Sequence, residues 1–180
     1  MRNQTKKLVQ AALLAALTAV GAFIRFPLGA MSFTLQDMFT VMAGVLLGWK
    51  WGAASQAAYV VLGLVGLPVF TQGGGLSYVF QPSFGFLLGL IPAAALTGAL
   101  AGERGEPRRV IPACVAGLAV LYLVGVPYMG MILNLYMGRG LSVWTIVKTG
   151  LLIYLPGDAL KVAVVAVVSP ALCRRLKVQA

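Results

Sequence analysis

Long apolar runs, separated by short loops that contain most of the charged residues, dominate this sequence. Of its 180 residues, 60% are hydrophobic and 10% are Asp, Glu, Lys or Arg, whereas soluble domains are usually about 25% charged. So few charges cannot cover the surface of a globular domain of this length. Because a helix of about 20 apolar residues crosses a bilayer, the pattern predicts one all-α integral membrane domain over residues 1–180.

The apolar runs predict a bundle of six transmembrane helices. The second run is short, so it can tilt, span part of the bilayer or continue into its neighbour. The first run follows Arg2, Lys6 and Lys7 as a signal peptide would, but its length and the runs behind it favour a retained helix. The predicted segments lie near 8–25, 36–49, 51–67, 82–102, 110–135 and 150–173.

The distribution of basic residues predicts the orientation, because Lys and Arg accumulate in cytoplasmic loops. With six spans, only Arg25, Arg139 and Lys148 fall on one side, so both termini are expected to be cytoplasmic. The net charge of +10 therefore reflects membrane orientation and contact with membrane lipid, and no motif predicts nucleic-acid binding. The opposite side contains Arg2, Lys6, Lys7, Lys50, Arg104, Arg108, Arg109, Arg174, Arg175 and Lys177.

The predicted outward loops are 26–35, 68–81 and 136–149. The middle loop has no charge and contains three consecutive glycines with several aromatic and amide side chains. A solvated linker would contain more charge, which favours an ordered cap over the helices. A flexible hairpin is the alternative, since glycine runs also favour mobility.

Asp158 and Lys161 are the strongest candidate for a functional site. They lie three residues apart, so on a helix they share one face, and they interrupt the apolar run 151–168. A charged side chain inside a membrane is costly unless it is paired or solvated, and such residues usually mark function. The alternative is an ion pair that only stabilises the helix. Neutral ligand contacts are expected from the outer regions, among Gln36, Gln72, Gln81, Thr71, Ser77, Tyr78 and Asn134.

Catalytic chemistry is not predicted. The chain has no His and four acidic residues, and Asp37 is expected to face water or cap its helix. The sequence contains no P-loop, no nucleophile motif and no metal-ligand spacing around Cys114 or Cys173. We therefore predict no enzyme activity, no metal site and no cofactor.

Small residues on the first segment predict close helix contacts. Alanines four residues apart form a flat stripe that lets another helix approach. Most such stripes serve packing inside a bundle, and a minority form a docking surface for another protein. The alanines concerned are Ala12 and Ala16, with Ala11, Ala15 and Ala19 nearby.

Together these motifs resemble the BioY family, the biotin-specific substrate-binding (S) components of energy-coupling factor (ECF) transporters. The resemblance covers nearly the whole chain. It rests on Ile24-Arg-Phe-Pro27, Phe33-Thr-Leu-Gln36, Ala43-Gly-Val-Leu-Leu-Gly48, Gly66-Leu-Pro-Val-Phe70, Gln81-Pro-Ser-Phe-Gly-Phe86 and Leu155-Pro-Gly-Asp-Ala-Leu-Lys161.

The resemblance implies a six-helix S component in a prokaryotic plasma membrane, with biotin as the transported ligand. It implies that Asp158 and Lys161 contact biotin beneath the loop that contains Gly74, Gly75 and Tyr78. It also implies that the alanine stripe docks on a transmembrane coupling protein, which works with two ATPase subunits.

Three other functions stay open on the residues alone. A lone secondary transporter usually has an internal repeat, and none is visible here. A membrane enzyme needs a carboxylate set or a nucleophile with its base, which four acidic residues scarcely provide. A purely structural subunit would bind no small molecule.

Overall fold

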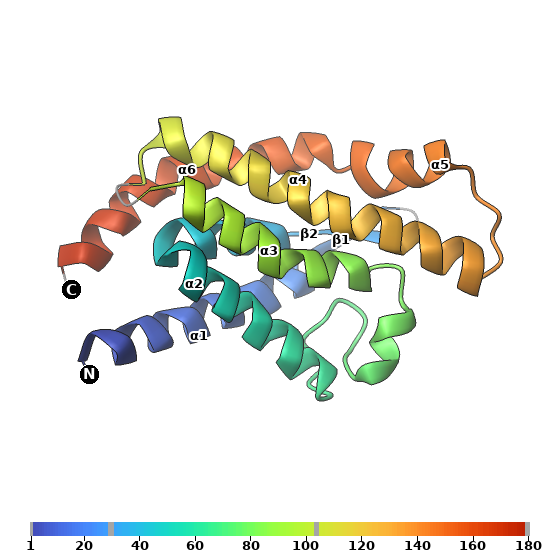
Figure 1. Cartoon of the computed structure of the whole chain (residues 1–180), viewed down its shortest axis with the longest axis horizontal. Helices are drawn as coiled ribbons and strands as arrows, with labels where there is room; N and C mark the ends of the chain where they lie inside the picture. Colours follow the sequence, from blue (N-terminus) through green and yellow to red (C-terminus); the bar gives the residue numbers. More distant parts are fainter. Residues whose placement is uncertain (1, 29–30, 103–104, 179–180) are drawn as a thin grey trace.

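The computed structural model describes residues 2–28, 31–102 and 105–178, which form an elongated bundle of helices (Figure 1). Each predicted apolar segment is helical over most of its length. The elements are α1 (Arg2–Phe23), β1 (Arg25–Leu28), β2 (Met31–Thr34), α2 (Gln36–Leu64), η1 (Leu76–Phe80), α3 (Phe84–Leu100), α4 (Pro107–Met131), η2 (Ile132–Tyr136), α5 (Val143–Val147), η3 (Lys148–Leu152) and α6 (Leu155–Val178).

Three helical stretches among the described residues are long and apolar enough to cross a membrane. They are Gln4–Phe23, Pro107–Tyr136 and Val143–Leu176, and the shorter Phe84–Leu100 is also apolar. The helical membrane fold that the sequence predicts is thus present, while the count of six transmembrane helices stays a prediction.

The chain reverses direction within α2, at Gly48. This residue has φ 75° and ψ 178°, a conformation that glycine adopts without the steric cost of a Cβ atom. The two halves then lie against each other, and Thr40 Oγ1 in the first half donates a hydrogen bond of 3.0 Å to Gln56 Oε1 in the second. The short second segment is therefore one half of a helical hairpin whose other half is the third segment.

Two of the predicted outward loops contain more regular structure than expected. Residues 26–35 include most of an antiparallel hairpin, in which Phe26 pairs with Phe33. Four-residue strands without a strong alternating pattern give little signal in an apolar sequence. Within 136–149, α5 begins at Val143, so the last helical stretch starts earlier than the predicted residue 150.

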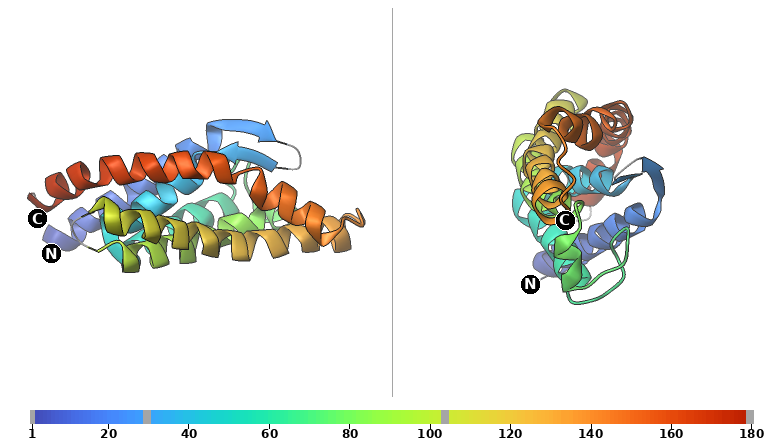
Figure 2. Two further views of the ribbon diagram at one scale, coloured as in Figure 1. Left: turned by 90° about the horizontal axis from the view of Figure 1, so that it is seen from above. Right: turned by 90° about the vertical axis from the view of Figure 1, so that its right-hand side faces the viewer.

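Both termini lie at one end of the bundle (Figure 1; Figure 2, left). The C-terminal end of α3 and the N-terminal end of α4 lie at the same end. Gly98 of α3 lies against the backbone of Gly48 and Trp49, so the segments that contain Lys50, Arg108 and Arg109 gather there. Arg104, which the sequence assigns to this side, lies outside the described residues. The hairpin and η1 lie away from this end.

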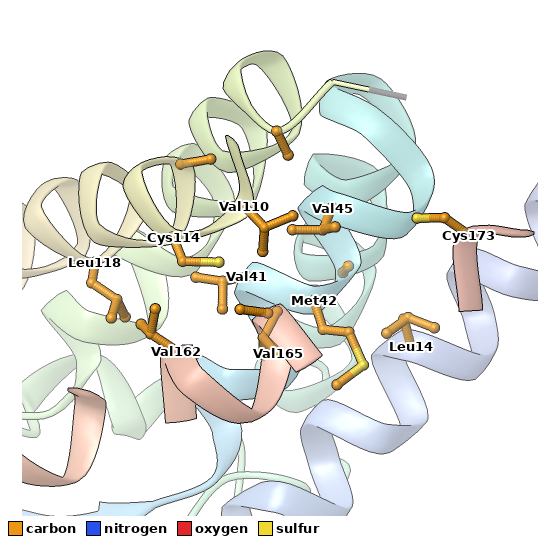
Figure 3. Close-up of a cluster of buried hydrophobic side chains, with 14 residues drawn as sticks. Leu14, Val41, Met42, Val45, Val110, Cys114, Leu118, Val162, Val165 and Cys173 are labelled. Atoms are coloured by element: carbon orange, nitrogen blue, oxygen red, sulfur yellow. The ribbon is translucent and has the colours of Figure 1, made fainter. Parts of the chain in front are cut away.

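Closely packed helices form the centre of the bundle. A Cβ atom on Gly98 of α3 would lie 2.5 Å from the backbone of Gly48 and Trp49, so only glycine permits this approach. A buried apolar cluster joins α1, α2, α4 and α6 (Figure 3). Its α6 members begin at Val162, the residue after Lys161, and continue to Cys173 near the C-terminus. Its labelled members are Leu14, Val41, Met42, Val45, Val110, Cys114, Leu118, Val162, Val165 and Cys173.

Candidate ligand-binding site

Lys161 lies between two carboxylates. Its Nζ atom is 2.9 Å from Oδ1 of Asp158, one helical turn earlier on α6, and 2.8 Å from both Oδ atoms of Asp37 in the first turn of α2. The side chains of Lys161, Asp158 and Asp37 are 6%, 5% and 14% exposed. Two carboxylates and one ammonium give this ion triad a formal charge of −1.

Aromatic residues hold the triad in place. The hydroxyl of Tyr122 on α4 donates to Oδ2 of Asp158, and the centroid of the Phe33 ring on β2 lies 3.9 Å from Lys161 Nζ. A cation over an aromatic face is attracted by the electron density of the ring. Phe33 can approach α6 because residue 157 is glycine, where a Cβ atom would lie 2.2 Å from the Phe33 ring.

A cavity of about 100 Å³ adjoins the triad, and Asp37, Asp158, Lys161 and Tyr122 all line it. Its remaining wall has a polar part and an apolar part. The polar part includes Ser32, Thr34, Gln36, Thr71, Gln72, Tyr78, Gln81 and Ser83, and the apolar part includes Phe86, Leu87, Leu90 and Leu121.

The cavity lies beneath the hairpin and the segment that precedes α3. These two segments form the rim of the cavity. The Arg25 guanidinium of β1 donates to the Thr71 carbonyl and so joins them. The cavity volume is smaller than that of most small-molecule pockets, about 300–1,000 Å³. The arrangement suits a solute with an apolar body and several hydrogen-bonding groups.

Comparison with known proteins identifies the family. The BioY family model matches residues 1–178. The chain is 48% identical over 138 residues to "Probable biotin transporter BioY" of Lysinibacillus sphaericus, covering 76% of this chain and 70% of that protein. It is 34% identical over 175 residues to "Biotin transporter BioY" of Thermotoga maritima, covering 97% and 99%. The chain belongs to the BioY family.

A solved structure supports the same assignment. The crystal structure of the S-component for biotin from an ECF-type ABC transporter matches with a TM-score of 0.84 at 25% identity, over 96% of this chain and 93% of that one. These relatives of the BioY-family chain are transporters or transporter components. They confirm the predicted fold and the prediction of a transport protein rather than an enzyme.

The structure brings seven of the residues expected to contact a ligand to the cavity of this BioY-family protein. Asp158, Lys161, Tyr78 and Gln81 line it, and so do the neutral candidates Gln36, Gln72 and Thr71. The Tyr78 hydroxyl lies 2.8 Å from Thr71 Oγ1 and accepts a hydrogen bond of 3.2 Å from Ser83 Oγ. The rim is therefore held by hydrogen bonds.

The other predicted ligand-binding residues lie elsewhere. The Asn134 amide donates to the Leu141 carbonyl and accepts from the Leu141 N–H, each at 2.8 Å, which closes the turn between η2 and α5. Gly74 packs against the end of α2, where a Cβ atom would lie 2.1 Å from the Leu67 carbonyl oxygen. Gly75 donates to the Gly63 carbonyl at 2.7 Å. These glycines shape the loop and do not line the cavity.

The alanine stripe divides between two faces of α1. Ala12 and Ala16 are exposed. Ala15 is buried in a cluster with Tyr59 and Val60, and Ala19 packs partly against the same cluster. Docking was predicted for all four, but Ala15 and Ala19 are occupied by packing inside the bundle, so the exposed surface contains Ala12 and Ala16.

Asp37 and Tyr122 are two residues in contact with the Asp158–Lys161 pair that sequence reasoning missed. The expectation that Asp37 faces water or caps its helix is wrong, because its carboxylate contacts Lys161. The sequence did contain a signal for Asp37, because Asp37 and Asp158 are the only acidic residues outside the loop around 103–106. Tyr122 gave no comparable signal, because tyrosine is common in membrane helices near the interface.

Proposed function

We propose that this BioY-family chain captures biotin from outside the cell, as the membrane-embedded substrate-binding subunit of an ATP-driven importer. The observation that carries the proposal is the buried ion triad on the wall of a cavity. Burying charged groups costs free energy. Their position beside a cavity is expected if these charged groups bind a ligand. The biotin transport of the named relatives supports the identity of that ligand.

The chemistry of the site fits biotin. The ligand has a cyclic urea with two N–H donors and one carbonyl, an apolar bicycle and a carboxylate tail. Asp158 can accept an N–H bond, and Lys161 can donate to a ligand oxygen. Phe86, Leu87 and Leu90 offer an apolar wall for the bicycle, and Tyr78 and Gln81 offer neutral hydrogen bonds.

The proposed orientation places the cavity toward the outside of a prokaryotic plasma membrane and both termini in the cytoplasm. It is supported by the basic segments that gather at the end with the termini. The exposed Ala12 and Ala16 of α1 would then face the transmembrane coupling protein. Import would follow when two ATPase subunits act on that protein, with no cofactor in this subunit.

Calorimetric titration of the purified protein in detergent tests the proposal. Biotin should bind tightly, desthiobiotin should bind because it retains the cyclic urea, and thiamine should not bind. Asp158→Asn should bind biotin at least about thirtyfold more weakly, since disrupting a buried charged contact costs about 2–5 kcal/mol. Glu106→Gln makes the same chemical change at an exposed position and should bind as the unmodified chain does.

Two results would refute the proposed function. One is the absence of biotin binding by the folded, unmodified chain. The other is an Asp158→Asn variant with unchanged biotin affinity, which would show that Asp158 does not contact the ligand. Uptake into liposomes that contain this chain alone would instead favour a self-sufficient transporter.

A further inference from the structure

Asp37 has a contact with Lys161 that a purely structural counter-ion does not require. Asp158 already neutralises the ammonium through a bond of 2.9 Å on the same helix. Asp37 adds a second carboxylate, from a helix that is distant in sequence, and both of its oxygens lie 2.8 Å from Nζ. A second buried carboxylate beside one ammonium raises the electrostatic cost of the site, so a ligand-related reason is expected.

The hydrogen bonds of the triad show which contact can be exchanged. The ammonium has three N–H donors, and the structure directs them to two oxygens of Asp37 and one of Asp158. The other Asp158 oxygen accepts from Tyr122. Asp37 therefore has the oxygen that can leave Lys161 without breaking its ion pair, and its side chain is the more exposed of the two carboxylates.

We infer that Asp37 is a specificity-determining residue of this site, and that Asp37 and Asp158 each accept one N–H of a cyclic urea. The order carboxylate, ammonium, carboxylate is acceptor, donor, acceptor. The edge of a cyclic urea is donor, acceptor, donor, with the carbonyl between two N–H groups. The two patterns are complementary, and this inference rests on the proposed function because biotin contains such a urea.

Binding then proceeds by an exchange of hydrogen bonds. One Asp37 oxygen releases Lys161 and accepts a ligand N–H, and the freed N–H of Lys161 donates to the urea carbonyl. The number of bonds to the buried charges does not fall. A ligand that lacks one N–H leaves a carboxylate oxygen without that bond, and sites built on such bonds reject such ligands strongly.

The test uses biotin and its two mono-N-methyl derivatives, each with a methyl group on one ureido nitrogen. Calorimetry compares the unmodified chain with Asp37→Ala, Asp37→Asn, Asp158→Asn and the exposed control Glu106→Gln. The unmodified chain should bind each derivative at least about tenfold more weakly than biotin, the loss expected for a hydrogen bond to a charged group. The control should behave as the unmodified chain.

Asp37→Ala should bind biotin about tenfold more weakly or worse, yet bind one of the two derivatives as well as it binds biotin. Asp158→Asn should lose part of its discrimination against the other derivative. Asp37→Asn retains a neutral carbonyl acceptor and should fall between the unmodified chain and Asp37→Ala. Should Asp37→Ala not fold, Asp37→Asn still allows the affinity for each derivative to be compared with the affinity for biotin.

An unchanged ratio of derivative to biotin affinity in both Asp37 variants would overturn the inference. Such a result would mean that Asp37 only positions Lys161, since a positioning role alters all three affinities together. Failure of the proposed function is distinguishable, because the unmodified chain would then not bind biotin at all.

Discussion

The ammonium of Lys161 on α6 lies 2.8 Å from both carboxylate oxygens of Asp37 on α2, although 124 positions separate these residues in the sequence. This contact joins two of the helices that line the cavity and extends a local ion pair into a triad. The following substitutions probe the triad, the helix packing around it and the surfaces outside it.

Lys161→Met should destabilise the ligand-free protein. The change leaves the carboxylates of Asp37 and Asp158 buried without a counter-ion, and breaking a buried ion pair costs about 3–5 kcal/mol. The thermal unfolding midpoint in detergent should fall accordingly. Adding Asp37→Asn should restore part of the loss, and the exposed Lys148→Met should have little effect. A Lys161→Met protein as stable as the parent would contradict the importance of the pairing.

Tyr122→Phe should weaken biotin binding while leaving the helices intact. The variant loses the hydroxyl that holds Asp158 in place, and a hydrogen bond to a charged group contributes about 1.5–3 kcal/mol. Titration with biotin measures the loss. Tyr136→Phe is the matched control, because Tyr136 is 63% exposed, and the two variants should differ clearly in affinity.

Gly98→Val should destabilise the packing of α3 on the reversal within α2. The new side chain would meet the backbone at Gly48 and Trp49, which cannot turn aside as a flexible side chain can. Overpacking a close contact costs about 1–3 kcal/mol or more, measurable as a lower unfolding midpoint. Ala99→Val changes the next residue, which is exposed, and equal effects of the two variants would rule out this account.

Asn134→Ala should separate stability from affinity. The variant loses both hydrogen bonds to Leu141, so the turn before α5 should be weakened by about 1–3 kcal/mol. Because Asn134 does not line the cavity, biotin affinity should stay close to that of the parent. A large loss of biotin affinity at normal stability would indicate that Asn134 contacts the ligand.

Substitutions on α1 should distinguish docking from packing. Ala12→Leu and Ala16→Leu enlarge exposed residues, so the purified protein should bind biotin normally while ATP-driven uptake with the coupling module falls. Ala15→Leu enlarges a residue that is 6% exposed and should lower stability instead. Normal uptake by both exposed variants would exclude this face as the docking surface.

Much of the architecture followed from the sequence alone. The apolar runs determined where helices form, because a bilayer requires every backbone group to be paired within a segment. The three-residue spacing determined that Asp158 and Lys161 share a face, since this relation is internal to one helix. Both rules act over a few residues, so they need no knowledge of the neighbouring helices.

Only the tertiary structure decided which residues meet across helices. It brought Asp37 and Tyr122 to the triad, directed Asn134 to Leu141, and turned Ala15 and Ala19 inward while leaving Ala12 and Ala16 exposed. The rotation of each helix about its axis, and the reversal at Gly48, determine these contacts. In a sequence that is apolar on nearly all helix faces, hydrophobicity does not distinguish an inward face from an outward one, so packing alone selects them.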